Sequence, residues 1–523
     1  MKNSVKNSLA VIVMMISFVL VFTACDPGGS GVPQQEPFNV TDEEGGTTLA
    51  EKLAWVKENA KSNFNYIIEV KANESFVPAG TDPDSELGPG YLSYAGKTNI
   101  GITLKGADEE RTISLLSNGS LFTVESEVTL TLGDKITLKG KSANEVSLVI
   151  VNKDGTLVMN TGAKITGNTV YLFSSKSGGV HVNGGIFTMN NGKISGNGAQ
   201  NSGGGGVCIT SGTFTMKGGE ISGNTASNNS GGAVYMTNGT FNMNGGKISG
   251  NSSTSTTTTY WGSGGVLVLG GTFNMNNGEI SGNTAQREGG GVYVKGTFNM
   301  NGGKISGNTA NDGGGVYVGG GWNLMNGGEI SGNTANRNGG GMYVNPGSLD
   351  MKDGKISNNT AVNGGGGVYI ESGGFWLIGG EISDNTANDG GGVYVLGSEY
   401  SGEFRQNGGK ISRNTATQNG GGVYLKRTSA KQSVVEFLMY KGEISGNTAG
   451  SGGGMYVSTN GTLNLQNGTI YGSNANASLK NTASSGAALY KEPTATAQNG
   501  TRSSSGVWTS KSELATTNNT ISY

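Results

Sequence analysis

The segment "GTFNMNGGKISGNTANDGGGVYV", residues 296–318, contains the pattern that decides the fold. Variants of it follow one another along the chain, and the isoleucine after its Lys or Glu returns most often every 25 to 27 residues. A period this short, kept over hundreds of residues, is typical of a stacked repeat architecture. A disordered chain, which the 96 glycines alone would favour, has no reason to keep it. The repeat isoleucines are Ile165, Ile194, Ile221, Ile248, Ile280, Ile305, Ile330, Ile356, Ile382, Ile411 and Ile444, with a degenerate copy at Ile470.

Each repeat has three short apolar pieces separated by glycines. The first contains Phe298 and Met300, the second centres on Ile305, and the third is Val316–Val318. Alternate residues are apolar in the first and third pieces, which is the period of a β-strand with one buried face, and nothing recurs every 3.6 residues. We therefore predict an all-β fold, a right-handed, single-stranded parallel β-helix (solenoid) with three short strands in each turn. A β-propeller is the alternative, but its blades need about 40 residues or more.

The residue before each repeat isoleucine alternates in sign from Glu220 onward. Equivalent residues stack about 4.8 Å apart in a β-helix, so alternation places opposite charges beside each other. We interpret the alternation as a mark of stacking rather than as a catalytic Lys–Glu motif. Lys135, Lys164 and Lys193 precede Glu220 without a change of sign. The alternating residues are Glu220, Lys247, Glu279, Lys304, Glu329, Lys355, Glu381, Lys410 and Glu443.

Two further repeat positions hold side chains with chemical potential. The asparagine after I-S-G, such as Asn308, is interpreted as one link of a hydrogen-bonded ladder, with a row of ligand amides as the alternative. The middle residue of V-Y-V, such as Tyr317, should point outward. It would form either an exposed stripe for sugar rings or a partner strand, or an aromatic ladder that stabilises the sheet. His181 and Cys208 occupy the same position and are interpreted as repeat variants, not as a catalytic pair.

Composition excludes several classes of function. The net charge of −2 does not favour nucleic acid, and one histidine and two cysteines are thin material for metal binding. The triple glycines lack the Lys-Ser/Thr of a phosphate loop and the Asp of a calcium-binding nonapeptide. We therefore expect no metal site, no cofactor and no nucleic-acid partner, and we expect a monomer.

The glycine after I-S becomes Asp384 in one repeat and Arg413 in the next. With Glu381 and Lys410 alongside, these residues predict a four-charge patch. A polysaccharide lyase or hydrolase on this kind of fold needs a cluster of acids with Arg or Lys. The patch offers no third acid for a metal and no general base, so we interpret it as a surface ion pair and expect no catalytic residue.

Composition and repeats together divide the chain into five parts. A cap at Thr47 or Thr48 begins a predicted helix whose apolar face holds Leu49, Leu53, Val56 and Ala60. The parts are a signal peptide (1–24), a flexible spacer (25–46), an N-terminal capping helix with degenerate β-helix rungs (47–154), a repeat β-helix of about 12–13 rungs (155–494) and a C-terminal cap or tail (495–523).

The N-terminus has the pattern of a secretory signal. Lys2 and Lys6 precede the apolar run Leu9–Phe22, whose 14 residues are fewer than the about 20 that span a bilayer. The run ends in "FTAC", which resembles the lipobox of bacterial lipoproteins, with the looseness at Phe22 that is familiar among spirochaetes. The resemblance implies lipid attachment at Cys25 and a membrane anchor. A cleaved signal with an unmodified cysteine is the alternative.

Three insertions interrupt the repeat, at 252–263, 397–406 and 426–440. Loops on a rigid scaffold are where binding concentrates, although neutral variation in length is an equal explanation. The residues with which these loops would contact a ligand are Tyr260, Trp261, Lys426, Arg427 and Lys431.

The run I-S-G-N-T-A-x-x-x-G-G-G-V-Y, as in Ile305–Tyr317, resembles the paired F-x-x-N and G-G-A-[ILV] motifs of chlamydial polymorphic outer-membrane proteins. Together with the signal, cysteine and helix, the chain is similar to repeat-rich surface lipoproteins of spirochaetes. The resemblance implies a pectin-lyase-like β-helix at the outer membrane and cell surface, without enzymatic activity, that serves adhesion, contact with a host protein or glycan, or antigenic variation. Asp26, after the lipidated cysteine, leaves an inner-membrane anchor facing the periplasm as the alternative. A polysaccharide-degrading enzyme and a purely structural spacer are the other readings of function.

Overall fold

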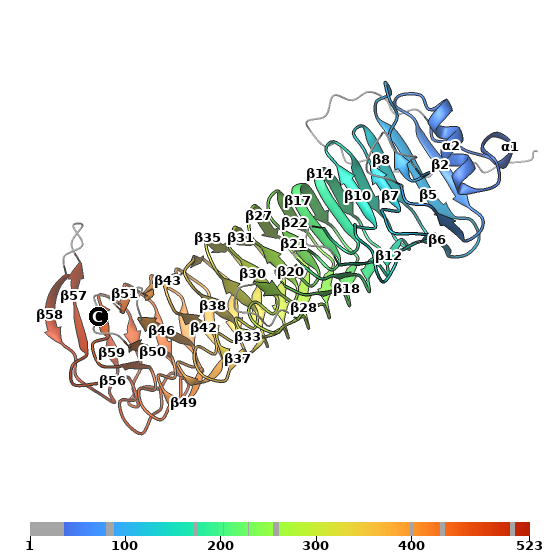
Figure 1. The fold of residues 1–523 in the computed structure, drawn as a ribbon. Helices are drawn as coiled ribbons and strands as arrows, with labels where there is room; N and C mark the ends of the chain where they lie inside the picture. Colours follow the sequence, from blue (N-terminus) through green and yellow to red (C-terminus); the bar gives the residue numbers. More distant parts are fainter. Residues whose placement is uncertain are drawn as a thin grey trace, which may run out of the picture.

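The computed structural model describes residues 36–522 except 80–87, 172–175, 202, 229, 255–260, 398–401, 429–434 and 503–507. The described chain forms a long rod of stacked turns (Figure 1). Sheets of 31, 16 and 10 strands run along the rod, and every pairing in the sixteen-stranded sheet is parallel except that of its last strand. The predicted all-β parallel β-helix is thus confirmed, with about 15 turns. No helix in the described ranges is long and apolar enough to cross a membrane.

One turn shows how the repeat folds. It consists of β31 (Thr297–Met300), β32 (Lys304–Ser306), β33 (Thr309–Asp312) and β34 (Val316–Val318), so most turns have four strands where the sequence predicted three. The missed strand is β33 and its equivalents in the ten-stranded sheet. Its Ala310 is buried, but one small apolar residue in a polar stretch gives no periodic signal.

The core is built from columns of identical residues. The phenylalanine rings from Phe187 to Phe298 are fully or almost fully buried, and successive centroids lie 4.6 to 5.2 Å apart. Each buried ring contributes about 1.5–3 kcal/mol. Asn323 occupies the phenylalanine position of the next turn without leaving a polar group unpaired. Its Oδ1 accepts from the Phe298 N–H, and its Nδ2 donates to the Gly320 and Ser348 carbonyls.

The asparagines after I-S-G form a continuous buried ladder. The Asn308 Oδ1 accepts hydrogen bonds from the backbone N–H and the Nδ2 of Asn283, at 2.9 and 3.0 Å. Its Nδ2 donates to the Ile280 carbonyl at 2.9 Å and to the Asn333 Oδ1 at 3.0 Å. Amide-to-amide bonds of this kind continue from Asn197 to Asn481. The predicted ladder is confirmed, and both sides of each amide are satisfied away from water.

The alternating charges lie in register, as predicted. Each isoleucine pairs with the next, and the preceding Lys and Glu face each other across adjacent turns. The side chains are about half exposed, so each ion pair contributes at most about 1 kcal/mol. The pairs are Lys193–Glu220 at 3.2 Å, Lys247–Glu279 and Lys304–Glu329 at 3.4 Å, and Lys410–Glu443 at 3.5 Å.

Two lysines before the alternation behave differently from one another. Lys164 stands beside Lys193 in the same column, and its Nζ binds Glu110, 2.5 Å away, which offsets the like charge. The placement of Lys135 in this column was wrong. Thr137, not Lys135, pairs with Lys164, because the irregular early turn shifts the register by two residues.

A helix closes the N-terminal end of the rod (Figure 1). In α2 (Leu49–Asn59), Thr48 and Glu51 form a reciprocal capping box, and the predicted apolar face is buried. The ordered cap begins earlier than predicted. The spacer was expected to reach residue 46, yet β1 (Phe38–Asn39) pairs with β2 (Asn65–Val70), and α1 (Asp42–Gly45) follows it. The physical reason is that Val40 packs into the core and Asp42 binds the buried Lys52.

The C-terminal end closes by reversing the chain. β57 (Thr496–Arg502) extends the largest sheet beside β54 (Thr462–Leu465), and β58 (Trp508–Glu513) pairs antiparallel to β57. β59 (Ile521–Ser522) pairs antiparallel to β55 (Thr469–Ile470). These antiparallel strands end the parallel stack, whose open edge would otherwise invite pairing with another chain.

The ladder predicts a sharp contrast between two asparagines of one turn. Asn308→Ala removes the partners of the Asn283 N–H and Nδ2 and of the Ile280 carbonyl, all buried. We expect a loss of roughly 2–5 kcal/mol in the free energy of unfolding, because each buried unsatisfied group costs about 1–3 kcal/mol. The Asn301 side chain bonds to two exposed neighbours, Asn276 and Asn326, so Asn301→Ala should change stability by less than about 0.5 kcal/mol. Urea unfolding followed by circular dichroism measures both, and equal losses would contradict the assigned role of the ladder.

Candidate functional site

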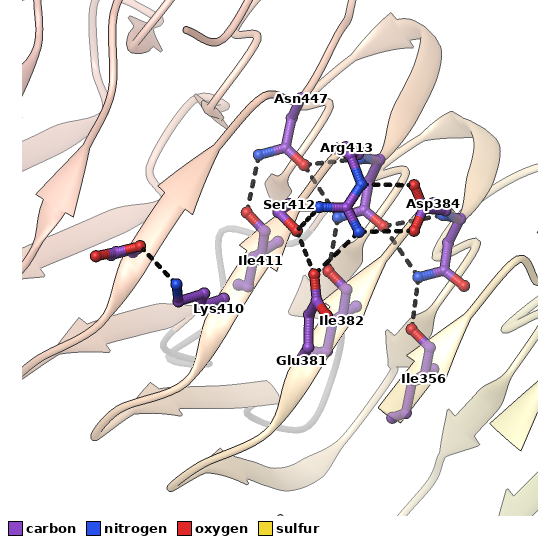
Figure 2. A network of polar contacts seen from close by, with 12 residues as sticks. Ile356, Glu381, Ile382, Asp384, Lys410, Ile411, Ser412, Arg413 and Asn447 are labelled. Carbon is purple, nitrogen blue, oxygen red and sulfur yellow. Dashed lines mark hydrogen bonds and ion pairs between the residues drawn. The ribbon is translucent and has the colours of Figure 1, made fainter. Parts of the chain in front are cut away.

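The charge cluster at one corner of the rod is the first candidate site (Figure 2). Asp384 follows β44 (Glu381–Ser383), and Arg413 follows β48 (Lys410–Ser412) one turn later. Both backbones are left-handed, with φ of 58° and 56°. Gly307, at the same corner in another turn, has φ of 63°, so the corner keeps its conformation whichever residue stands there. A non-glycine residue is strained in this conformation, which is a reason to look for a compensating interaction.

The compensating interaction is a guanidinium held by two carboxylates. Arg413 Nε and Nη2 each donate to one oxygen of Asp384, both at 2.9 Å. Arg413 Nη2 also donates to Glu381 Oε1 at 3.1 Å, and Nη1 donates to Ser412 Oγ at 3.2 Å. The Ser412 hydroxyl in turn donates to Glu381 Oε1 at 2.7 Å. A two-pronged arginine–carboxylate pair is among the stronger polar contacts in proteins.

The electrostatics of this cluster do not suit acid–base catalysis. The Arg413 hydrogen bonds hold the pKa of Asp384 below its ordinary value. Burial pushes the pKa of Glu381 upward, but the hydrogen bond from Ser412 and the charge of Arg413 outweigh it and lower the pKa. Both carboxylates are therefore ionised at neutral pH and already engaged, so neither is a ready proton donor.

The predicted four-charge patch holds three of its members. Lys410 is not one of them, because its Nζ points away and pairs with Glu443 at 3.5 Å (Figure 2). Ser412 joins the cluster instead. The sequence shows a serine at this position in most repeats, so nothing marked this copy as different.

A second acid cluster was missed by the sequence reasoning. Glu288 and Asp312 lie on adjacent turns, just before the triple glycines, and form a β-bridge. Arg287 Nη2 lies 3.1 Å from Glu288 Oε1, and Arg337 binds Asp312. Burial raises the pKa of both acids despite these arginines. Glu288 Oε2 is buried without a hydrogen-bond partner among the described residues. The available signal was two successive acids at a position that the later turns fill with Asn, Gly or Ser, except for Asp389.

The tyrosine stripe is buried, which excludes the exposed binding stripe and supports the other interpretation, the aromatic ladder. Tyrosines from Tyr293 to Tyr456 keep only 2–9% of their surface exposed. From Tyr293 to Tyr394 the rings stack with centroids 4.7 to 5.0 Å apart. The rings do point away from the core, but the glycine corners lie against them. A Cβ on Gly364 would stand 2.7 Å from the Tyr394 ring. The stripe is therefore the stabilising aromatic ladder given as its alternative.

Of the two variants in the stripe, Cys208 is buried and His181 is half-buried. Burial lowers the pKa of His181 to about 4, and its Nε2 lies 2.9 Å from the Thr210 hydroxyl. Burial raises the pKa of the Cys208 thiol above its usual range, so the thiolate form is disfavoured at neutral pH. This agrees with their interpretation as repeat variants.

Of the predicted loop residues that the structure describes, Trp261 lies several turns away from Lys426 and Arg427, so these three do not form one site. Trp261 carries the Lys295 ammonium 3.3 Å from its ring centroid, a cation–π contact within the rod. Lys426 and Arg427 belong to β50 (Val423–Arg427), which pairs with β46 (Val393–Gly397), so their assignment to a loop was wrong. The repeat strand is simply two residues longer in these turns. Tyr260, Lys431 and the predicted lipid attachment at Cys25 lie outside the described residues.

Comparison with known proteins supports the architecture. Residues 255–407 match the family model described as a right handed beta helix region. No curated protein and no solved structure matches the chain. The architecture occurs in enzymes and in non-enzymes, so the match leaves the activity to be argued from the site. Within the described part of the chain, no three His, Cys, Asp or Glu side chains gather as potential metal ligands.

A double-mutant cycle tests whether the first cluster is a structural ion pair. Arg413→Gly leaves Asp384 and Glu381 without their counter-charge and should destabilise the protein. Asp384→Gly in the same chain should restore most of the loss, because glycine suits the left-handed corner. We expect a coupling energy on the order of 1 kcal/mol at low salt, shrinking at high salt. Thermal unfolding of the four proteins measures it, with Lys410→Gln as the neighbouring control, and a coupling of zero would contradict the pairing.

Proposed function

We propose that this chain is a non-catalytic lipoprotein of the cell surface whose β-helical rod holds a binding face away from the membrane. The observation that supports it most is the pairing of the charges that interrupt the repeat. Arg413 is bound by Asp384 and Glu381, and the acids of the second cluster each have their own arginine. General acid–base catalysis needs a titratable group that is free to reach the substrate. These groups are directed at each other.

The membrane anchor in this proposal is a lipid on Cys25. It is supported by the basic residues, short apolar run and small-residue cleavage pattern of the N-terminus. The regular columns of the rod support the other half of the proposal. They make a stiff, extended spacer, as stacked repeats do in general, and stiffness suits display rather than enclosure of a substrate.

A polysaccharide-degrading enzyme is the second candidate, and one observation favours it. Glu288 and Asp312 are two acids on adjacent turns whose pKa values are raised by burial, the direction of shift that favours a general acid. Their arginine partners argue for a structural role, yet the unpartnered Glu288 Oε2 leaves this cluster the better place to test for catalysis.

Release of sugars from polysaccharides decides between the two candidates. The full-length chain is incubated with neutral and polyuronate polysaccharides, and reducing ends and unsaturated products are measured. We expect neither product above the background of a heat-denatured sample. Products that disappear in Glu288→Gln and Asp312→Asn, while Lys410→Gln keeps them, would overturn the non-catalytic proposal.

Protease treatment of intact cells tests the location. We expect protease added outside the cells to trim the protein, and Cys25→Ser to release it from the membrane fraction. A periplasmic marker that stays intact is the control for cell integrity. Full protection in intact cells, with digestion only after lysis, would place the protein in the periplasm instead.

A further inference from the structure

One stretch of the outer sheet face departs from the repeat and exposes aromatic rings. In regular turns this face carries a Thr and an Asn on either side of the buried Phe, and the asparagines bond along the rod, as Asn299 does to Asn274 at 2.9 Å. The pattern ends at β35 (Trp322–Met325). From there the same two columns hold larger and charged residues, namely Trp322, Leu324, Asp350, Trp376, Glu403 and Arg405.

The two tryptophans come from turns that are not adjacent. Trp322 begins β35 and Trp376 lies in β43 (Gly373–Leu377), with β39 (Ser348–Met351) between them. Their ring centroids are nevertheless only 4.9 Å apart, with the ring planes 15° from parallel. Gly374 makes this possible, because a Cβ there would stand 2.3 Å from the Trp376 ring. The Trp376 ring folds over that glycine toward the intervening turn.

The pair of stacked tryptophan rings is covered by Arg405 at the Trp376 end and exposed to solvent at the Trp322 end. The Arg405 guanidinium lies 5.7 Å from the Trp376 ring centroid, and Arg405 Nε is held by Glu403 at 2.5 Å. Trp322, at the opposite end, keeps 57% of its surface exposed, the largest fraction among the large apolar side chains of the described residues. Exposing an indole ring to water beside a second, stacked indole costs free energy, and such exposed apolar surface is typical of a binding site.

Polar groups converge on the same place. A shallow hollow of about 190 Å³ is lined by both tryptophans together with Asp350, Ile378, Arg405 and Asn407. Asp350 Oδ1 is buried and accepts no hydrogen bond from the described residues. Burial raises the pKa of the Asp350 carboxyl, although the nearby Trp322 indole and the charge of Lys352 oppose this shift. A buried acceptor without a donor costs free energy.

From this geometry we infer that Trp322, Trp376 and Asp350 form a binding site for a neutral, hydroxyl-rich glycan. A sugar ring offers an apolar C–H face for the open indole and hydroxyl donors for the Asp350 carboxylate that lines the hollow. Charge complementarity points away from anionic chains, because Asp350 lines the hollow and the Arg405 guanidinium is already paired with Glu403. The inference rests on the proposed binding role of the rod and names the class of partner.

Affinity electrophoresis through gels containing β-glucan, mannan or soluble chitin derivatives tests the site, followed by calorimetry with oligosaccharides of the retarding polymer. We expect at least one of these neutral glycans to retard the full-length chain. Trp322→Ala and Asp350→Asn should each weaken binding roughly tenfold or more. Gly374→Ser, which displaces the Trp376 ring, should do the same. Ile186→Ala is the matched control, because Ile186 holds the equivalent position in an earlier turn and is 48% exposed.

Thermal unfolding of every variant separates loss of the site from loss of the fold, since removing an exposed ring should leave the unfolding temperature unchanged. Retardation that persists in Trp322→Ala, absence of retardation by all neutral glycans, or retardation only by polyuronate that vanishes with salt would each overturn the inference. A neutral glycan that binds and is also cleaved would sink the non-catalytic proposal while leaving the site intact. If protease reaches the protein on intact cells but no neutral glycan binds, the proposed surface location stands and the glycan site is contradicted.

Discussion

The buried asparagine ladder is the interaction on which the rest of the structure depends. Each amide joins its own turn to both neighbours through bonds that no water can replace, so the axial position of every turn is fixed at one corner. Once that corner is fixed, the register of each strand follows, and equivalent residues are compelled to stack. The phenylalanine, tyrosine and Lys/Glu columns are consequences of this one constraint. None of them could hold the register as well, because the burial of apolar surface is non-directional and the charges are exposed.

The period and its alternation were enough to predict the fold, because stacking copies a local pattern into a global one. The same reasoning fails wherever the answer depends on what lies over a side chain. Alternation predicted that Tyr317 points outward, which is right, but it could not decide whether the ring is exposed, because the glycine corner that covers the ring comes from a different part of the turn. Lys410 was assigned to the wrong cluster for a similar reason. It stands in register between Glu381 and Glu443, one on each neighbouring turn, and the sequence does not tell which of the two it binds.

The candidate binding residues were beyond the sequence because they meet only through register. Trp322 and Trp376 are two turns apart, and each alone reads as one irregular residue in a repeat. Gly374 gives no signal in the sequence either, because it is one of 96 glycines. Its lack of a side chain nevertheless leaves the space that the Trp376 ring occupies. Glu288 and Asp312 show the same limit. The candidate functional residues of this chain are those that differ from the repeat consensus. Which of them lie close together can be seen only from the register between neighbouring turns.

The alternating charge column also constrains how such a rod can change length. Each turn contacts only its neighbours, so whole turns can be gained or lost by recombination between near-identical segments without disturbing the rest. Loss of a single turn would bring two lysines or two glutamates together at the junction. Loss of two turns would leave every lysine facing a glutamate. The natural unit of growth and shortening for this rod is therefore a pair of turns, and length variants should differ by multiples of about 50 residues.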